Sequence, residues 1–540
     1  MHQTYMQTVF ANFKKQKIAY ISLFVILLFC LVGIYAPFLA SSKPLFVKDG
    51  DTFYFPLFRY LFFQGFYTKP LDLFFNLLMF TFPLMAAVFF IFKNKKKWLA
   101  ASFLFLLFLQ FALFLFFLLF KVKDPAEDIK LNQARQEALI GQKGMPSFAF
   151  DLKYMNDYKK LNLVLRHVLL KRQNQRLNKI TAGYREDAKK HFLENEARDK
   201  RLSLLRQGIA PENIPNEQEL KKMVLSEMKE EDILAKTEIP TLFNNAQENE
   251  KKQIARLKEA LAKNPEDLSA KDTLQYIQDK NKWLKEKSGQ IKWLLMPLIR
   301  DFHFEEDAGG EQGLNQHLPW WELSRVNRKD LTAALIFGVR VSLVVGLLAV
   351  GLSLLIGIPI GAYAGYYGGN FDIIVSRLIE VLDAMPTFFM LLMIIAIMQS
   401  KSIFLVIVMI GFFGWTGFSR YIRAEFFKQR NLPYVESAHA LGYKNSRIMF
   451  SHILPNAIPP LLTLLPFAVM GAITSEAGLS FLGLGEEGAA SWGVLMDEGR
   501  SAFPQESYLL WPPAILLTLL LVAIALVGDG LRDAIDPKMR

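Results

Sequence analysis

Long apolar segments are the feature of this 540-residue chain that most restricts its fold. They lie near residues 18–40, 71–93, 98–120, 333–363, 374–399, 403–424, 456–482 and 511–531. A helix needs about 20 apolar residues to cross the hydrocarbon core of a bilayer, and a soluble core could not hold so many segments of that length. With 52% hydrophobic residues and 47 phenylalanines, the sequence predicts an all-α, polytopic membrane protein with eight crossings.

Clusters of Lys and Arg beside these segments predict the orientation of the chain, because short cytoplasmic loops carry an excess of basic residues. The clusters are Lys14, Lys15 and Lys17, then KNKKK at 93–97, then the residues from Arg420 to Arg447. All three clusters lie on the cytoplasmic side of the membrane if the N terminus is cytoplasmic and every segment crosses once. We therefore expect a bacterial inner-membrane protein with cytoplasmic N and C termini, a retained signal anchor at its first segment, and residues 121–332 on the extracytoplasmic side.

Net charge, cysteine content and histidine content argue against nucleic-acid binding, disulfide bonds and a metal site. The net charge of +12 is explained by topology signals, so we expect membrane lipid and no nucleic acid as a partner. The single cysteine, Cys30, lies inside the first apolar segment and leaves no disulfide possible within the chain. The seven histidines form no paired-ligand motif, so no metal site is expected.

Composition divides the chain into three regions. Residues 1–120 hold three of the apolar segments, and residues 329–540 hold the other five. Residues 121–328 are instead rich in Lys, Glu, Gln and Asn, with apolar residues spaced three and four apart, and they predict a mostly α-helical extracytoplasmic insert. The nearly balanced charges of the insert favour a solvated helix surface, and binding of a partner remains an alternative.

A polar segment at 434–456 separates the sixth apolar segment from the seventh, on the predicted cytoplasmic side. It suits short helices with Ala438, Leu441, Ile448 and Phe450 as apolar contacts, and Gly442 permits a turn between them. Pro455 fits the first turn of the helix that follows. The segment is either a docking element for another protein or a linker on the membrane surface.

The order of residues in this segment resembles a known motif. Glu436-Ser437-Ala438, then three residues, Gly442, then nine residues and HILP resembles the EAA loop of ABC-importer membrane subunits. Further blocks between 329 and 540 resemble the dipeptide and oligopeptide (C-type) permeases, among them SEAGLSFLGLG and GDGLRDAIDP. The chain departs from their pattern at Asn327 to Asp330, and KPLFVKDGDTFYFP resembles the microcin-type peptide branch.

The resemblance implies a type I ABC importer transmembrane fold, here with an extra N-terminal helical hairpin and the large insert. It also implies a permease that forms half of a peptide pathway with a homologous second permease, two cytoplasmic ATPase subunits and an extracytoplasmic substrate-binding protein. Its coupling loop would comprise Glu436, Ser437, Ala438, Leu441, Gly442, Arg447, His452 and Pro455. The class of peptide stays open.

The chain itself lacks the G-x-x-x-x-G-K-[ST] loop that cradles nucleotide phosphates. We therefore expect no enzyme activity and no cofactor in this chain, with ATP and Mg on the partner ATPase. A hydrolase is disfavoured because neither G-x-S-x-G nor H-E-x-x-H occurs. The alternative is an envelope scaffold or interaction protein that acts through the insert.

Three carboxylates in or beside the apolar segments are candidates for the pore or a subunit interface: Glu476, Glu380 and Asp383. A carboxylate within a span is costly and usually faces a pathway or a partner. For Glu380 and Asp383 the alternative is an interfacial ion pair with Arg377, one turn back. For Glu476 the alternative is a position near the extracytoplasmic end of its span.

Overall fold

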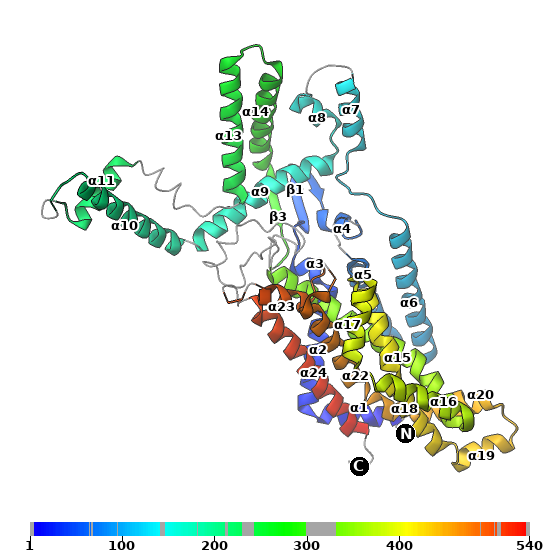
Figure 1. Ribbon diagram of the computed structural model, residues 1–540. Helices are drawn as coiled ribbons and strands as arrows, with labels where there is room; N and C mark the ends of the chain where they lie inside the picture. The colour runs from blue at the N-terminus through cyan, green and yellow to red at the C-terminus, as the bar shows by residue number, and fades with distance from the viewer. Residues whose placement is uncertain are drawn as a thin grey trace. The chain divides into compact units, whose positions relative to one another are not determined.

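A computed structural model describes residues 5–63, 65, 69–93, 95–140, 146–180, 182–210, 214–228, 242–298, 331–486, 488–501, 503–504 and 509–535 (Figure 1). The chain divides into two compact units. The membrane unit consists of Met1–Ala40, Gly65–Lys121 and Ala333–Arg540, and the insert unit consists of Ser41–Gln64 and Val122–Thr332. The insert unit thus takes in a short piece of the N-terminal region as well as the long polar segment.

The membrane unit is built from helices. Its N-terminal helices are α1 (Tyr5–Lys15), α2 (Lys17–Ile34), α3 (Ala36–Leu39), α5 (Pro70–Phe92) and α6 (Lys96–Leu119). They are followed by α15 (Leu331–Tyr367), α16 (Gly369–Asp383), α17 (Thr387–Met398), α18 (Ile403–Gln429), α19 (Pro433–Ala440), α20 (Asn445–Arg447), the π-helix η4 (Ile448–Ile453), α21 (Leu454–Leu462), α22 (Leu465–Leu479), the π-helix η5 (Ser480–Leu484), α23 (Trp492–Ser501) and α24 (Trp511–Ile535).

Within the described ranges, seven single helices are long and apolar enough to cross a membrane, and the pair α16 and α17 raises the count to eight if it forms one span. The expected span at 374–399 corresponds to this pair, which bends by 76° at a short break that contains Pro386. The expected span at 456–482 is likewise interrupted between α21 and α22, after Pro459 and Pro460.

Packing at the chain ends decides between these counts. Val9 and Phe13 of α1 pack with Val527 and Ala534 of α24, so the start of the first span lies beside the end of the last span (Figure 1). A chain that returns to the end of the bundle where it began has crossed an even number of times. The geometry of the membrane unit therefore favours eight crossings, with α16 and α17 together forming one of them.

Glycines allow α15 and α18 to pack with their backbones in close contact. Gly357, Gly361 and Gly365 recur at every fourth residue of α15 and form a stripe along one side of the helix. A Cβ atom added at Gly357 would lie 2.7 Å from the carbonyl oxygen of Trp415, and one at Gly361 would lie 3.0 Å from the Cα of Ser419. These two helices form the centre of a buried cluster that extends to η4 and α21.

The insert unit is mostly helical, as predicted, but it also contains a small sheet. Its helices are α4 (Pro56–Tyr60), α7 (Ile129–Ile140), α8 (Phe148–Tyr154), α9 (Asp157–Ile180), α10 (Ala182–Arg206), α11 (Glu217–Glu227), α13 (Leu242–Lys263) and α14 (Leu268–Ser288). The strands β1 (Phe46–Asp49), β2 (Thr52–Tyr54) and β3 (Ile291–Leu295) form an antiparallel sheet in the order β2-β1-β3. Val47, Tyr54 and Leu294 share the face of the sheet that packs on α9.

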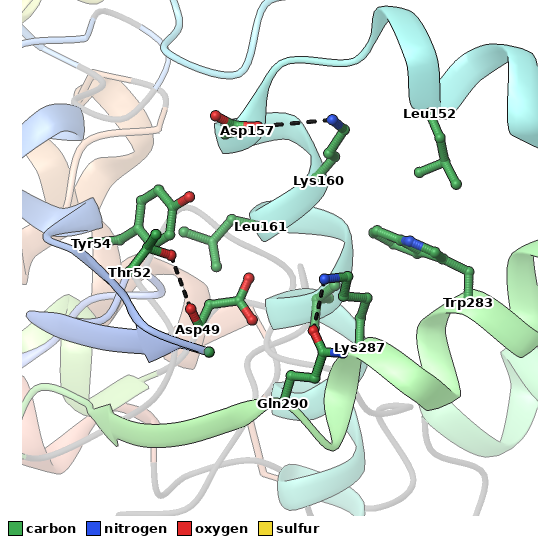
Figure 2. A pocket seen from close by; sticks show the side chains of 12 residues that line it. Asp49, Thr52, Tyr54, Leu152, Asp157, Lys160, Leu161, Trp283, Lys287 and Gln290 are labelled. Carbon is green, nitrogen blue, oxygen red and sulfur yellow. Dashed lines mark hydrogen bonds and ion pairs between the residues drawn. The ribbon is translucent and has the colours of Figure 1, made fainter.

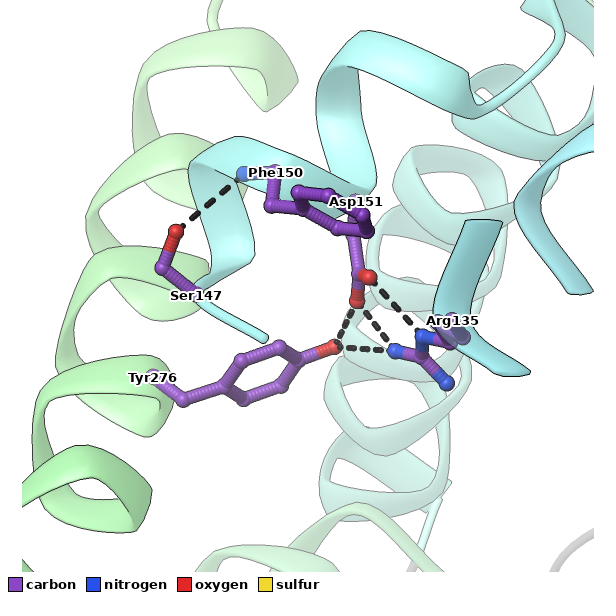
Figure 3. Close-up of polar contacts among 5 residues, drawn as sticks. All are labelled: Arg135, Ser147, Phe150, Asp151 and Tyr276. Carbon is purple, nitrogen blue, oxygen red and sulfur yellow. Dashed lines mark hydrogen bonds and ion pairs between the residues drawn. The ribbon is translucent and has the colours of Figure 1, made fainter. Parts of the chain in front are cut away.

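A buried carboxylate holds three helices of the insert unit together (Figure 3). Asp151 of α8 accepts hydrogen bonds from the guanidinium of Arg135 on α7 and, at 2.8 Å, from the hydroxyl of Tyr276 on α14. Burial raises the pKa of Tyr276 to about 12, and the bond to Asp151 acts in the same direction. The Ser147 hydroxyl accepts from the backbone N–H of Phe150 and caps α8 at its start.

Candidate functional site

The polar segment between α18 and α21 folds into two short helices with a fixed turn between them. Pro433 occupies the first turn of α19, where a missing N–H costs little. At the other end, Gly442 has a φ of +73°, and the N–H groups of Gly442 and Tyr443 donate to the carbonyls of His439 and Ala438. This pattern ends a helix with a glycine in the left-handed region, which explains the glycine in the motif.

The segment has a buried side and an exposed side. Val435, Ala438, Ile448, Met449 and Ile453 are at most 5% exposed and belong to the main cluster of the membrane unit. The exposed side carries Glu436, Ser437, Leu441, Gly442 and Arg447. Two of the expected apolar contacts, Ala438 and Ile448, therefore anchor the segment and are not free to bind a partner. Leu441, in contrast, is 72% exposed, and Phe450 is 38% exposed.

Polar and aromatic contacts fix the segment to α15. The hydroxyl of Tyr366 lies 3.1 Å from Nε2 of His439 and donates, at 3.1 Å, to Oδ1 of Asn445. Around the second short helix, the Arg447 guanidinium lies 4.4 Å from the centre of the Tyr443 ring. Through Tyr366, both short helices are therefore in contact with α15.

The last two residues of the predicted loop lie where α20 continues into α21. The ring of His452 stacks on the Tyr443 ring with centres 5.6 Å apart. The backbone carbonyl of His452 accepts a bond from Nδ2 of Asn456 at 2.9 Å. Pro455 is exposed within the first turn of α21, as expected. His452 thus packs against Tyr443 beside the turn at Gly442, whereas Pro455 is exposed to solvent.

Ion pairs connect α16 to α18 close to this segment. The Asp372 carboxylate accepts hydrogen bonds from Nε and Nη2 of Arg423, and Asp383 pairs with Arg420. The expected pair with Arg377 forms only from Glu380, whose Oε2 lies 2.6 Å from the Arg377 Nη1. Asp383 therefore joins two helices, while Glu380 is paired within its own helix, and a pore or interface role for either residue stays a prediction.

Glu476 is 2% exposed, and its carboxylate is satisfied by its own chain. The hydroxyls of Ser480 and Ser491 donate to Oε1 at 2.7 and 2.6 Å. The next residue, Trp492, donates from its indole N–H to the Leu335 carbonyl at 3.0 Å. The SWG sequence at 491–493 therefore joins α22, α23 and α15, and a pore or interface role for Glu476 stays a prediction.

Sequence reasoning missed one buried charge in the membrane unit. Arg340 of α15 is fully buried and donates to Asp72 Oδ1 at 2.9 Å, to Asn76 Oδ1 at 3.0 Å and to the Gly33 carbonyl at 2.8 Å. These bonds fix the hairpin helix α5 and the end of α2 to the core. Asp72 and Asn76, four residues apart in an apolar segment, were the signal that could have revealed this contact.

Across the residues that the structure describes, no group of three or more His, Cys, Asp or Glu side chains could hold a metal ion. The candidate site is the exposed side of residues 434–456, named here the docking surface after the role that the sequence predicts for it. Its parts are an exposed leucine, flanking charges and a backing of buried side chains that connects it to the membrane helices.

Comparison with known proteins gives two family matches. Residues 357–540 match the family described as binding-protein-dependent transport system inner membrane component. Residues 4–56 match the N-terminal TM domain of oligopeptide transport permease C. The two matches lie on either side of the hairpin and of most of the insert unit.

Several curated proteins are similar to this chain. The peptidoglycan transport system permease protein YejE of Agrobacterium fabrum is 39% identical over 211 residues, which cover 39% of this chain and 55% of that protein. The oligopeptide transport system permease protein OppC of Bacillus subtilis is 36% identical over 46% of this chain and 82% of its own length. The dipeptide transport system permease protein DppC of the same organism is 32% identical, with coverages of 50% and 88%.

Among solved structures, the inward-facing methionine ABC transporter MetNI covers 38% of this chain and 96% of its own chain, at 19% identity and a TM-score of 0.32. A score this low carries no argument about how the helices are arranged. The assignment of the chain rests on the sequence matches. The match at residues 357–540 includes the segment that builds the docking surface and the helix α18 that precedes it.

Proposed function

Since this chain belongs to the family of binding-protein-dependent transport system inner membrane components, we propose that it couples ATP hydrolysis on a partner to movement of its own membrane helices. Members of this family are transport permease subunits and not enzymes, and they work with other components of an ABC importer. This chain is accordingly a multi-pass inner-membrane permease subunit. The proposal concerns which surface receives the ATPase and how its movement reaches the pathway.

The docking surface around Leu441 is the observation that carries the proposal. A 72% exposed leucine on the same exposed side as Glu436 and Arg447 gives an ATPase cleft one apolar anchor and two charges to recognise. When ATP closes the ATPase pair, the two short helices would move with it. Because Val435, Ala438 and Ile448 belong to the main cluster, α15 and α18 would follow and switch the pathway between its two states.

The finer assembly is part of the proposal. We infer a homologous second permease that completes the pathway, two ATPase subunits that bind ATP with Mg, and an extracytoplasmic substrate-binding protein. The names of the similar proteins, which transport oligopeptides, dipeptides and glutathione, support peptides as the substrate class. The basic clusters support cytoplasmic N and C termini, with the insert unit outside.

Co-purification tests the docking surface. Leu441→Arg should remove the associated ATPase subunit and its ATP turnover, because a charged side chain replaces the exposed anchor without touching the buried side. Leu268→Arg is the matched control, since this leucine is also 72% exposed but belongs to α14 of the insert unit. An ATPase that stays bound to the Leu441→Arg protein, or that never accompanies the wild-type protein, would overturn the proposal.

A further inference from the structure

The insert unit contains a cavity of about 410 Å³ that the transport mechanism does not use (Figure 2). One wall is the turn between β1 and β2, a second is α9, and a third is the end of α14. The lining residues are Asp49, Gly50, Thr52, Tyr54, Leu152, Asp157, Lys160, Leu161, Val164, Trp283, Lys287 and Gln290. A cavity of this size lies in the range of pockets that hold small organic ligands.

Pairing of the strands positions the charged residues of this cavity. The N–H of Gly50 donates to the carbonyl of Gln290 at 3.2 Å, which brings the end of β1 next to the end of α14. Asp49 and Lys287 therefore line the same end of the cavity, although they are far apart in the sequence. Lys160 projects from α9 on another side of the space (Figure 2).

The charged side chains that line the cavity make few or weak ion pairs within the described part of the chain. Among the described residues, the carboxylate of Asp49 has no cation within 4 Å, and its backbone carbonyl alone accepts a bond, from Thr52. The ammonium of Lys287 donates to the neutral Gln290 amide at 2.7 Å. The Lys160 ammonium lies 3.8 Å from Asp157, whose side chain is 76% exposed. Each of these groups retains bonding capacity for a ligand.

The indole of Trp283 is the main apolar part of the lining. Figure 2 shows it directed toward the cavity below Leu152, while Leu161 and Val164, which also line the cavity, are at most 4% exposed. Phe148 braces that indole from outside the cavity, with ring centres 5.6 Å apart. An aromatic wall held in this way can bind an apolar side chain without having to be ordered first.

We propose that this cavity binds a small zwitterion with an apolar side chain, namely an unblocked dipeptide-sized ligand. The Asp49 carboxylate receives the α-ammonium group, Lys160 on another side of the cavity receives the carboxylate, and the indole of Trp283 receives the side chain. The equal number of Asp and Lys residues in the lining disfavours an anion such as phosphate, because two carboxylates would oppose it. The assignment gives the insert unit a ligand site of its own.

Binding to the purified full-length protein, in nanodiscs without ATPase or binding protein, tests the assignment. The probes for calorimetry are Ala-Phe, N-acetyl-Ala-Phe and Ala-Phe-amide. Each blocked probe should bind about tenfold more weakly than Ala-Phe, because each lacks one charge-assisted contact. Equal binding of all three probes, or no binding of Ala-Phe at millimolar concentration, would overturn the proposal.

Matched variants locate the contact. Asp49→Asn should weaken Ala-Phe about tenfold and leave N-acetyl-Ala-Phe unchanged, whereas Asp51→Asn, in the same turn with a 99% exposed side chain, should change neither. Lys160→Gln should weaken Ala-Phe about tenfold and leave Ala-Phe-amide unchanged, whereas the exposed Lys285→Gln should change neither. If Asp49→Asn and Asp51→Asn behave alike, the ligand binds elsewhere in the chain.

This site is independent of the proposed transport function. The Leu441→Arg protein, which should lose its ATPase, should still bind Ala-Phe with unchanged affinity. The two inferences are separate if the Leu441→Arg protein loses its ATPase and still binds Ala-Phe. They are also separate if the Asp49→Asn protein keeps its ATPase and binds Ala-Phe more weakly. Ala-Phe binding that fails only in the Leu441→Arg protein would instead assign the ligand to the transport pathway and refute the cavity.

Discussion

The membrane unit and the insert unit both bury a charged group, but they satisfy it differently. Arg340 in the membrane unit has no exposure and uses Asp72, Asn76 and a backbone carbonyl. Asp151 in the insert unit is equally buried, yet its partner Arg135 has a side chain that is 40% exposed. Where lipid is the solvent, every donor must be satisfied by protein, whereas beside water half of a pair can stay hydrated.

The largest effect should come from breaking the buried pair in the membrane unit. Asp72→Ala leaves the Arg340 guanidinium buried without its counter-charge, and such a loss costs about 3–5 kcal/mol. We expect a large drop in the free energy of unfolding of the membrane unit, measured by denaturant titration in detergent micelles. Asp72→Ala with Arg340→Met removes both charges and should recover part of the stability. Equal stability of the Asp72→Ala and wild-type proteins would contradict the comparison.

The next effect concerns the close contact between α15 and α18. Gly361→Leu places a side chain against the backbone of Ser419, and overpacking of this kind costs about 1–3 kcal/mol. Gly351→Leu is the matched control in the same helix, because nothing lies within 4 Å of a Cβ added there. Thermal unfolding in detergent should separate the two variants. Similar unfolding temperatures would mean that the helices are not held in this contact.

The features that the sequence predicted are local in the chain. The helical spans follow from runs of apolar residues, and the turn at Gly442 follows from a motif that is complete within a few residues. The docking side of the segment was predicted less well, because Ala438 and Leu441 look alike as apolar residues and only the fold decides which one is buried. Periodicity specifies that a helix exists, not which side of it meets the core.

The features that the sequence missed depend on residues far apart in the chain. Strand β1 pairs with β3 across more than 240 residues, and short strands of that kind carry no periodic signal. Arg340 and Asp72 are separated by 268 positions, so the sequence around one residue does not indicate that it contacts the other. The bend between α16 and α17 was hidden because apolar composition continues through it, and only Pro386 marked the place.

A smaller effect, in the insert unit, depends on pH. Tyr276 titrates near pH 10 when unfolded and at about 12 when folded, so its contribution to stability is complete below pH 10 and is lost as the pH rises to 12. Because the ring is only partly buried, we expect a loss of about 1 kcal/mol after allowance for screening by water. Tyr276→Phe should flatten the stability of the insert unit over this window, as followed by circular dichroism. An unchanged slope would exclude Tyr276 as the cause of the pH dependence.

The smallest effect should come from the pair Arg377 and Glu380, which lies on one helix with side chains 76% and 58% exposed. Pairs of this kind contribute about 0.3–0.5 kcal/mol, so Glu380→Gln should leave the free energy of unfolding almost unchanged. Asp372→Asn is the informative comparison on the same helix, because the Asp372 side chain is 13% exposed and its partner Arg423 belongs to α18. That change removes a contact between helices and should cost several times more. If the two variants cost the same, exposure does not decide the strength of the ion pairs at this surface of the membrane unit.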